Sequence, residues 1–272
     1  MKKSKICPNC ANTYDGLNYE CPHCHTVNDD ADADTLKNYV VYPWYKQLSL
    51  FLGGFLGFQV LGLIISTILY LFQGEEGLSS AFINFGAYFL TFIGLVCITL
   101  PQPQKLLKTF KRGKHYLIGL AGFGVLMVFT ILYANVLEIA GLGITDNENE
   151  SGLQSIISVY PVLSLLIFGI VGPICEELTY RVGIFSLLRR VNRPLAYALS
   201  ALIFALIHFN IPIPFETNAF INELINIPNY LFAGLVMGFL YDHYGLAASL
   251  SAHVYNNVYA IVVSIIAPYL NI

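Results

Sequence analysis

The sequence predicts an all-α polytopic membrane protein of six to eight transmembrane helices, with a small cysteine-rich head at its amino-terminal end. Of the 272 residues, 56% are hydrophobic and only 11% are charged, against roughly 25% charged residues in soluble domains. Long uncharged runs follow one another through most of the chain, and two cysteine pairs precede the first run. The small net charge of −3 gives no reason to expect nucleic acid as a partner.

The head, residues 1–25, contains the pairs Cys7/Cys10 and Cys21/Cys24. Each CxxC pair can direct two thiolates to one ion, so two pairs predict a tetrahedral four-cysteine zinc site. A segment this short buries too little apolar surface to fold alone, and the metal would stabilise it. The segment resembles a zinc ribbon of the short CPxC type, which implies a structural role or a cytoplasmic protein partner. The alternative is a pair of disulfides, which needs an oxidising compartment.

We predict an acidic linker over 26–45, because its first part, 26–38, contains four aspartates and few large apolar groups. The transmembrane domain then occupies 46–272. Its apolar runs cover 48–72, 80–100, 116–140, 153–190, 195–209, 228–242 and 246–267. Since a span needs about 20 residues, the first three runs fit and the fifth and sixth are short. The fourth is too long for one straight span, and we expect Gly172-Pro173 to break it, with a new helix beginning at Pro173.

The distribution of Lys and Arg predicts the orientation in the membrane. Basic residues gather before the first span, at 105–114 and at 189–193, whereas the loops 74–77 and 145–152 are acidic. The positive-inside rule therefore places the amino terminus and both basic segments in the cytoplasm. That compartment is reducing, which favours zinc over disulfides in the head.

The stretch CEELTYR, residues 175–181, places three charges in otherwise apolar sequence. A charge at the bilayer centre costs roughly 2.5–3.5 kcal/mol on insertion scales, so a charged residue there usually has a structural or functional role. Glu177 and Arg181 are spaced i, i+4 and can pair on one helix face. Glu176 points about 100° away and stays free for proton transfer. We also expect the dipole of a helix beginning at Pro173 to stabilise both carboxylates. The alternative is a structural ion pair at a helix end.

Two further polar groups interrupt apolar helices. His208 lies in FALIHF, where a single histidine is more often a core residue than a base. His253 and Asn257 share a helix face, so Asn257 could orient the imidazole; the alternative is a hydrogen bond that ties two helices together.

These groups can meet at one depth. The segment RRVNRP forms a turn around Asn192, and Glu176 and His208 each lie sixteen residues from it, or about 24 Å along an antiparallel hairpin. Glutamate, two histidines and asparagine in one dry cavity predict a hydrolytic site. Glutamate can act as general base, while histidine stabilises an oxyanion or protonates the leaving amine. Alternatively, glutamate and two histidines hold a catalytic divalent metal with an open position for water.

Three motifs carry a resemblance to a known family: E-E-x-x-x-R at 176–181, F-x-x-x-H at 204–208 and H-x-x-x-N at 253–257. In this order they resemble the CAAX-processing endopeptidase and bacteriocin-processing family, CPBP or Abi, over about residues 115–267. The resemblance implies an intramembrane endopeptidase that cleaves a peptide or membrane-protein substrate in a bacterial plasma membrane. It implies Glu176 as the water-activating residue, with Glu177 and Arg181 as its support. The remaining catalytic group would be His208, His253 and Asn257.

Two other classes of protein remain open. A non-catalytic scaffold or bacteriocin-immunity protein would keep the same fold, with the head recruiting a partner. A transporter would use the buried ionisable residues as a proton relay, but the chain has no detectable internal repeat. Other intramembrane proteases fit less well, because the sequence contains neither H-E-x-x-H nor G-x-S-x-G.

Overall fold

A computed structural model describes residues 4–15, 21–24, 26, 42–74, 79–100, 106–142, 147–212 and 214–270. Most of the expected linker lies outside these residues, as do the loops 75–78, 101–105 and 143–146.

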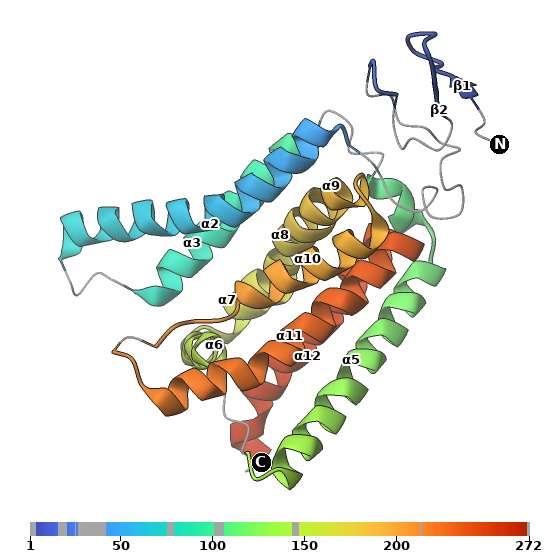
Figure 1. The fold of residues 1–272 in the computed structure, drawn as a ribbon. Coiled ribbons are helices and arrows are strands. Elements are labelled where there is room, and N and C mark those ends of the chain that lie inside the picture. Colours follow the sequence, from blue (N-terminus) through green and yellow to red (C-terminus); the bar gives the residue numbers. More distant parts are fainter. Residues whose placement is uncertain are drawn as a thin grey trace.

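The chain forms a helical bundle (Figure 1) in which six of the described helices are long and apolar enough to cross a membrane. They are α2 (Trp44–Gln73), α3 (Ser80–Thr99), α5 (Lys114–Ile139), a composite helix at Pro161–Arg189, α11 (Thr217–Tyr244) and α12 (Leu246–Leu270). A shorter apolar helix, α10 (Arg193–Leu206), packs on α11. The predicted all-α polytopic class is confirmed, with a count at the lower end of six to eight.

The outer faces of the long helices are apolar. Leu63 and Phe72 of α2 are 69% and 84% exposed, and Ile139 of α5 is 87% exposed. In water such faces would associate, whereas lipid tails solvate them. The protein is therefore an integral membrane protein.

The fourth apolar run is broken at a different place from the one predicted. Helix α6 (Glu148–Val159) ends at Tyr160, and the chain then stays helical from Pro161 to Arg189. This composite helix consists of α7 (Pro161–Leu166), η3 (Ile167–Val171), α8 (Gly172–Glu177), η4 (Leu178–Phe185) and α9 (Ser186–Arg189). The predicted break at Gly172-Pro173 is wrong. The helix widens to π-type hydrogen bonding in η3 just before Pro173, and such local widening accommodates the proline ring.

Helix α11 is longer than the predicted run 228–242, because it begins at Thr217 and continues through Pro228. Its first half carries polar residues that lowered the apolar signal, among them Glu223 and Asn226. Both are buried against other helices rather than exposed.

Helix α2 packs closely on η4, where glycines on both sides permit the approach. A Cβ atom on Gly54 would lie 1.7 Å from Oγ1 of Thr179, and a Cβ atom on Gly183 would lie 2.9 Å from the backbone nitrogen of Phe51. Small residues at such contacts let membrane helices approach closely. The contact fixes the helix that carries CEELTYR against the first span.

The turn between the composite helix and α10 lies where the sequence predicts it. The side chain of Asn192 accepts a hydrogen bond from the amide of Leu195 at 2.7 Å and so caps α10. Asp242, at the end of α11, is fully buried and binds Arg189 and Arg193, with N–O distances of 3.2 and 2.7 Å. These ion pairs fasten the hairpin to α11.

Candidate active site and metal centre

The four cysteines of the head lie together. Strand β1 (Ser4–Ile6) pairs antiparallel with β2 (Thr13–Asp15), and the turn between them carries Cys7 and Cys10. The four sulfur atoms all lie within 4.8 Å of one another. The Sγ atoms of Cys7 and Cys24 are 3.4 Å apart, and those of Cys10 and Cys21 are 3.6 Å apart.

This geometry suits a metal ion better than disulfides. A disulfide needs sulfur atoms about 2.05 Å apart, and all four thiols are free. A tetrahedral ion about 2.3 Å from each sulfur spaces them about 3.8 Å apart, close to the observed distances. The hydroxyl of Thr26, 3.1 Å from Cys24 Sγ, and the Thr26 backbone amide lower the pKa of the Cys24 thiol to about 6, which favours the ligating thiolate. The cluster could hold a metal such as zinc.

In the membrane domain, Glu177 is a fully buried carboxylate with three partners. Its Oε1 atom lies 3.5 Å from Nε of Arg181, which is also fully buried, so the predicted i, i+4 pair forms. The same oxygen lies 3.0 Å from Nδ1 of His253, and Oε2 accepts a hydrogen bond from Ser249. Glu177 therefore joins the composite helix to α12.

His253 lies between the two neighbouring glutamates. Because an ionised carboxylate can only accept, the Nδ1 atom of His253 donates to Glu177. This contact turns Nε2 toward Oε2 of Glu176, 3.5 Å away. The Glu176 side chain is 15% exposed, whereas that of Glu177 is 0% exposed. Glu177 is held by arginine, as the sequence predicts, whereas Glu176, which the sequence leaves free, lies beside an imidazole.

His208 reaches the same cluster from the turn that follows α10. The ring of Phe204 contacts both histidines, with its centroid 4.9 Å from that of His208 and 6.0 Å from that of His253. His208 also interacts electrostatically with Glu176 and His253. Its Nδ1 donates to the carbonyl oxygen of Phe204 at 2.8 Å, so in the neutral ring Nε2 carries the lone pair. The predicted convergence of Glu176, His208 and His253 is thus observed.

Asn257 occupies the same face of α12 but makes a different contact. Its Nδ2 donates to the backbone carbonyl of Phe168 at 3.1 Å, and its Oδ1 accepts from Asn256 at 3.4 Å. Phe168 belongs to η3, where the regular helical hydrogen bonding is altered. The contact is a hydrogen bond between helices, the alternative that the sequence left open.

The expected dipole effect is not present. The backbone at Val171, just before α8, is already helical, and the helix extends back to Pro161. Glu176 and Glu177 therefore lie in the middle of a helix and not at its amino terminus. Arg181, Ser249 and His253 stabilise the buried charge instead.

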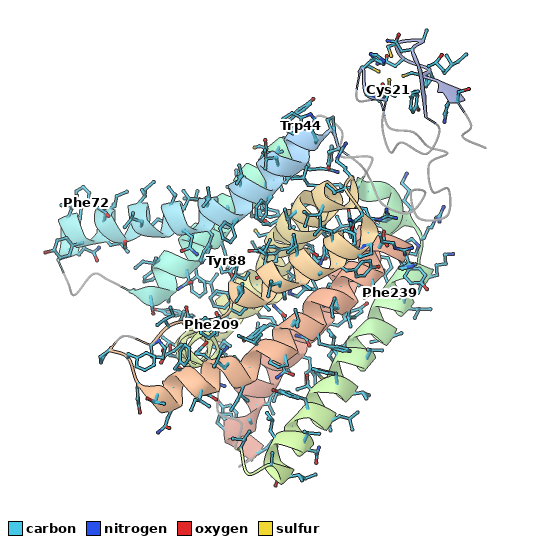
Figure 2. The ribbon with its side chains drawn as sticks, in the orientation of Figure 1. Cys21, Trp44, Phe72, Tyr88, Phe209 and Phe239 are labelled. Atoms are coloured by element: carbon cyan, nitrogen blue, oxygen red, sulfur yellow. The ribbon has the colours of Figure 1, made fainter. Side chains whose placement is uncertain are left out.

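Sequence reasoning missed Tyr88 of α3. Its ring lies beside Gly172, since a Cβ atom there would be 3.4 Å from Tyr88 Cε1, and its phenol interacts with Glu176 one turn further along the helix. Figure 2 labels this side chain between α3 and the composite helix. No pattern in the sequence distinguishes Tyr88 among 18 tyrosines.

The membrane cluster does not fit a three-ligand metal site as it is arranged. Both ring nitrogens of His253 face carboxylates, and Glu177 is already held by three partners. Glu176 and Nε2 of His208 are then the two groups left to bind a metal. A catalytic zinc needs three protein ligands. Among the described residues, only the four cysteines bring three or more ligand atoms together.

Comparison with known proteins supports the resemblance carried by the three motifs. Residues 158–259 match the family model described as Type II CAAX prenyl endopeptidase Rce1-like, and this range includes all six predicted site residues of the membrane domain. The match is narrower than the predicted 115–267.

An uncharacterized protein of Mycoplasma capricolum subsp. capricolum is 25% identical over 179 residues, which are 61% of this chain and 50% of the relative. The chain thus spans about half the length of that relative. No solved structure matches the chain.

Proposed function

We propose that this protein is an intramembrane endopeptidase that hydrolyses a peptide or membrane-protein substrate by a glutamate-activated water. The observation that supports this proposal most directly is the position of His253, whose ring nitrogens lie 3.0 Å from Glu177 and 3.5 Å from Glu176 in a buried cluster. The family match over 158–259 supports the reaction class.

Glu176 is the general base in this proposal. It takes a proton from a water molecule while the water oxygen attacks the carbonyl carbon of the scissile amide. His253, oriented by Glu177, receives or returns the proton at Nε2. His208 in its protonated form donates from Nε2 to the oxyanion or to the leaving nitrogen as the C–N bond breaks. The ring nitrogens of His253 and the carboxylate oxygens of Glu177 are already engaged with other side chains, which favours this scheme over catalysis by a bound metal.

The description of the matching family suggests a prenylated CAAX peptide as the first substrate class to test. The basic segments suggest an amino terminus in the cytoplasm, and the analogy with the family suggests a bacterial plasma membrane. In that orientation a zinc-loaded head would face cytoplasmic protein partners.

The test uses the full chain in lipid nanodiscs with a farnesylated CAAX peptide that carries a fluorophore and a quencher. We expect the wild-type chain to cleave it and Glu176→Gln to lose at least about 100-fold in kcat. The matched control is Glu138→Gln, since Glu138 is exposed near the end of α5. Cleavage by Glu176→Gln at the wild-type rate would reject the proposal. The peptide without its prenyl group shows whether the lipid is required.

A scaffold or immunity protein is the second candidate. The four-cysteine cluster favours it, because the head lies outside the matched range 158–259 and can recruit a partner without catalysis. Under this alternative Glu176→Gln would spare the cellular phenotype, whereas Cys7→Ser would abolish it.

A further inference from the structure

Glu223 is a second buried carboxylate that the proposed mechanism does not use. It lies on α11 and is 2% exposed. No ion pair links it to a described cation. Burial of an unpaired charge is costly unless hydrogen bonds compensate it, so its partners indicate what it does.

Both partners are backbone amides from segments far apart in the sequence. Oε1 accepts from the amide of Glu148 at 2.8 Å, and Oε2 accepts from the amide of Asn210 at 3.0 Å. Glu148 begins α6, where an amide has no partner within its own helix. Asn210 lies beyond the end of α10, two residues after His208. One carboxylate therefore joins the start of α6 to the turn that carries His208.

Asn147 makes a second tie to the same turn. Its Nδ2 atom lies 3.4 Å from the carbonyl oxygen of His208 and 3.2 Å from the hydroxyl of Tyr230, and its Oδ1 caps α6 through the amide of Glu150. Asn147 is 1% exposed.

Tyr230 completes the contacts around His208. Its ring stacks on the imidazole with centroids 4.3 Å apart and planes 13° apart. Tyr230 follows Glu223 by seven residues on α11, so both project from one face of that helix.

We propose that Glu223 is a positioning residue that, with Asn147 and Tyr230, fixes the His208 turn for proton transfer. The inference rests on the proposed function. The turn needs external support because it has only short-range hydrogen bonds of its own, such as His208 N to Ala205 O at 3.2 Å. A displacement of about 1 Å at a catalytic group can cost on the order of 100-fold in rate.

The test compares Glu223→Gln with Glu216→Gln in the full chain in nanodiscs. Glutamine keeps the size of the side chain but has one acceptor oxygen for two amides. Glu216 lies just before α11, is exposed and makes no side-chain cap bond, so it is a matched control. We expect kcat on the farnesylated peptide to fall about 10- to 100-fold in Glu223→Gln with KM within about twofold, and the control to match the wild type.

Amide hydrogen exchange over 207–211 is the second readout. It should speed up in Glu223→Gln and not in Glu216→Gln. Unchanged exchange in Glu223→Gln, or faster exchange with unchanged kcat, overturns the proposal. If the wild-type chain cleaves no peptide, the proposed function fails, while exchange still decides whether Glu223 holds the turn.

A second variant covers the case in which Glu223→Gln does not fold. Asn147→Asp keeps the oxygen that caps α6 but loses the donor to His208 and Tyr230. It should slow kcat and speed exchange in the same way, and wild-type values of both would overturn the proposal.

Discussion

The Nδ1 atom of His253 lies 3.0 Å from Oε1 of Glu177, a contact between residues 76 positions apart that sets the direction of the whole imidazole ring. Because Nδ1 must donate to this carboxylate, the other nitrogen faces Glu176.

Replacement of Glu177 by glutamine should destabilise the fold as well as remove activity. Arg181 is fully buried and would keep its charge without the partner 3.5 Å away. Removal of one member of a buried pair costs roughly 3–5 kcal/mol. Thermal unfolding in detergent measures the loss. The double variant Glu177→Gln/Arg181→Met should recover part of it, and an equal or larger loss in the double variant would contradict the assigned ion pair.

His208→Gln should reduce kcat by about 100- to 10,000-fold and leave the unfolding temperature within about 2 °C of the wild type. The reason is that the ring hydrogen bond described for His208 stays within its own segment, at Phe204, while glutamine keeps part of the contact with the Tyr230 ring. His23→Gln in the head is the control, because His23 is exposed. A fall in the unfolding temperature that accounts for all lost activity would instead indicate a structural histidine.

Asn257→Ala separates the two roles that the sequence left open for this residue. The Nδ2 contact with the Phe168 carbonyl at 3.1 Å predicts a loss of about 0.6–1.7 kcal/mol in stability. We expect kcat, calculated per molecule of folded protein, to stay within about threefold of the wild type. A fall of about 100-fold in kcat at unchanged stability would place Asn257 in the catalytic group, as the family resemblance implies.

The head should bind one zinc ion per chain, since its four thiols lie within 4.8 Å of one another. Elemental analysis of the purified protein measures the ratio. Cys7→Ser or Cys21→Ser should abolish binding, whereas Cys97→Ser, at an exposed position on α3, should not. Full zinc content in Cys7→Ser would show that the metal is held elsewhere.

Gly54→Ala should destabilise the contact of α2 with η4, because the new Cβ atom would lie 1.7 Å from Oγ1 of Thr179. We expect a loss of about 1–3 kcal/mol, typical of overpacking. Gly57→Ala is the matched control on the same helix, since nothing lies within 4 Å of a Cβ atom there. Equal stability of the two variants would mean that the helices do not approach this closely.

Much of the architecture was predictable, because length and apolarity dictate spans and the turn at Asn192 carries its own capping side chain. The pairing of Glu177 with Arg181 follows from i, i+4 spacing, and its geometry confirms the prediction. The break at Pro173 was wrong because local widening of the helix leaves no mark in composition.

Glu223 and Tyr88 were missed for a related reason. Their partners come from segments far away in the sequence, and only packing brings those segments together. The run predicted for α11 was also too short. In a sequence, polar residues that face other parts of the protein cannot be distinguished from polar residues that face water.

The widened stretches on both sides of Gly172–Glu177 have a consequence for how this helix tolerates change in length. A π-type turn holds about one residue more than a regular α-helical turn. The direction in which side chains beyond each widened stretch point therefore depends on that extra residue. Loss of one residue between 178 and 185 would be absorbed by reversion to the narrower winding, which keeps the carboxylates in phase with Arg189 and its anchor at Asp242. A loss that the narrower winding did not absorb would turn the acid away from the imidazole.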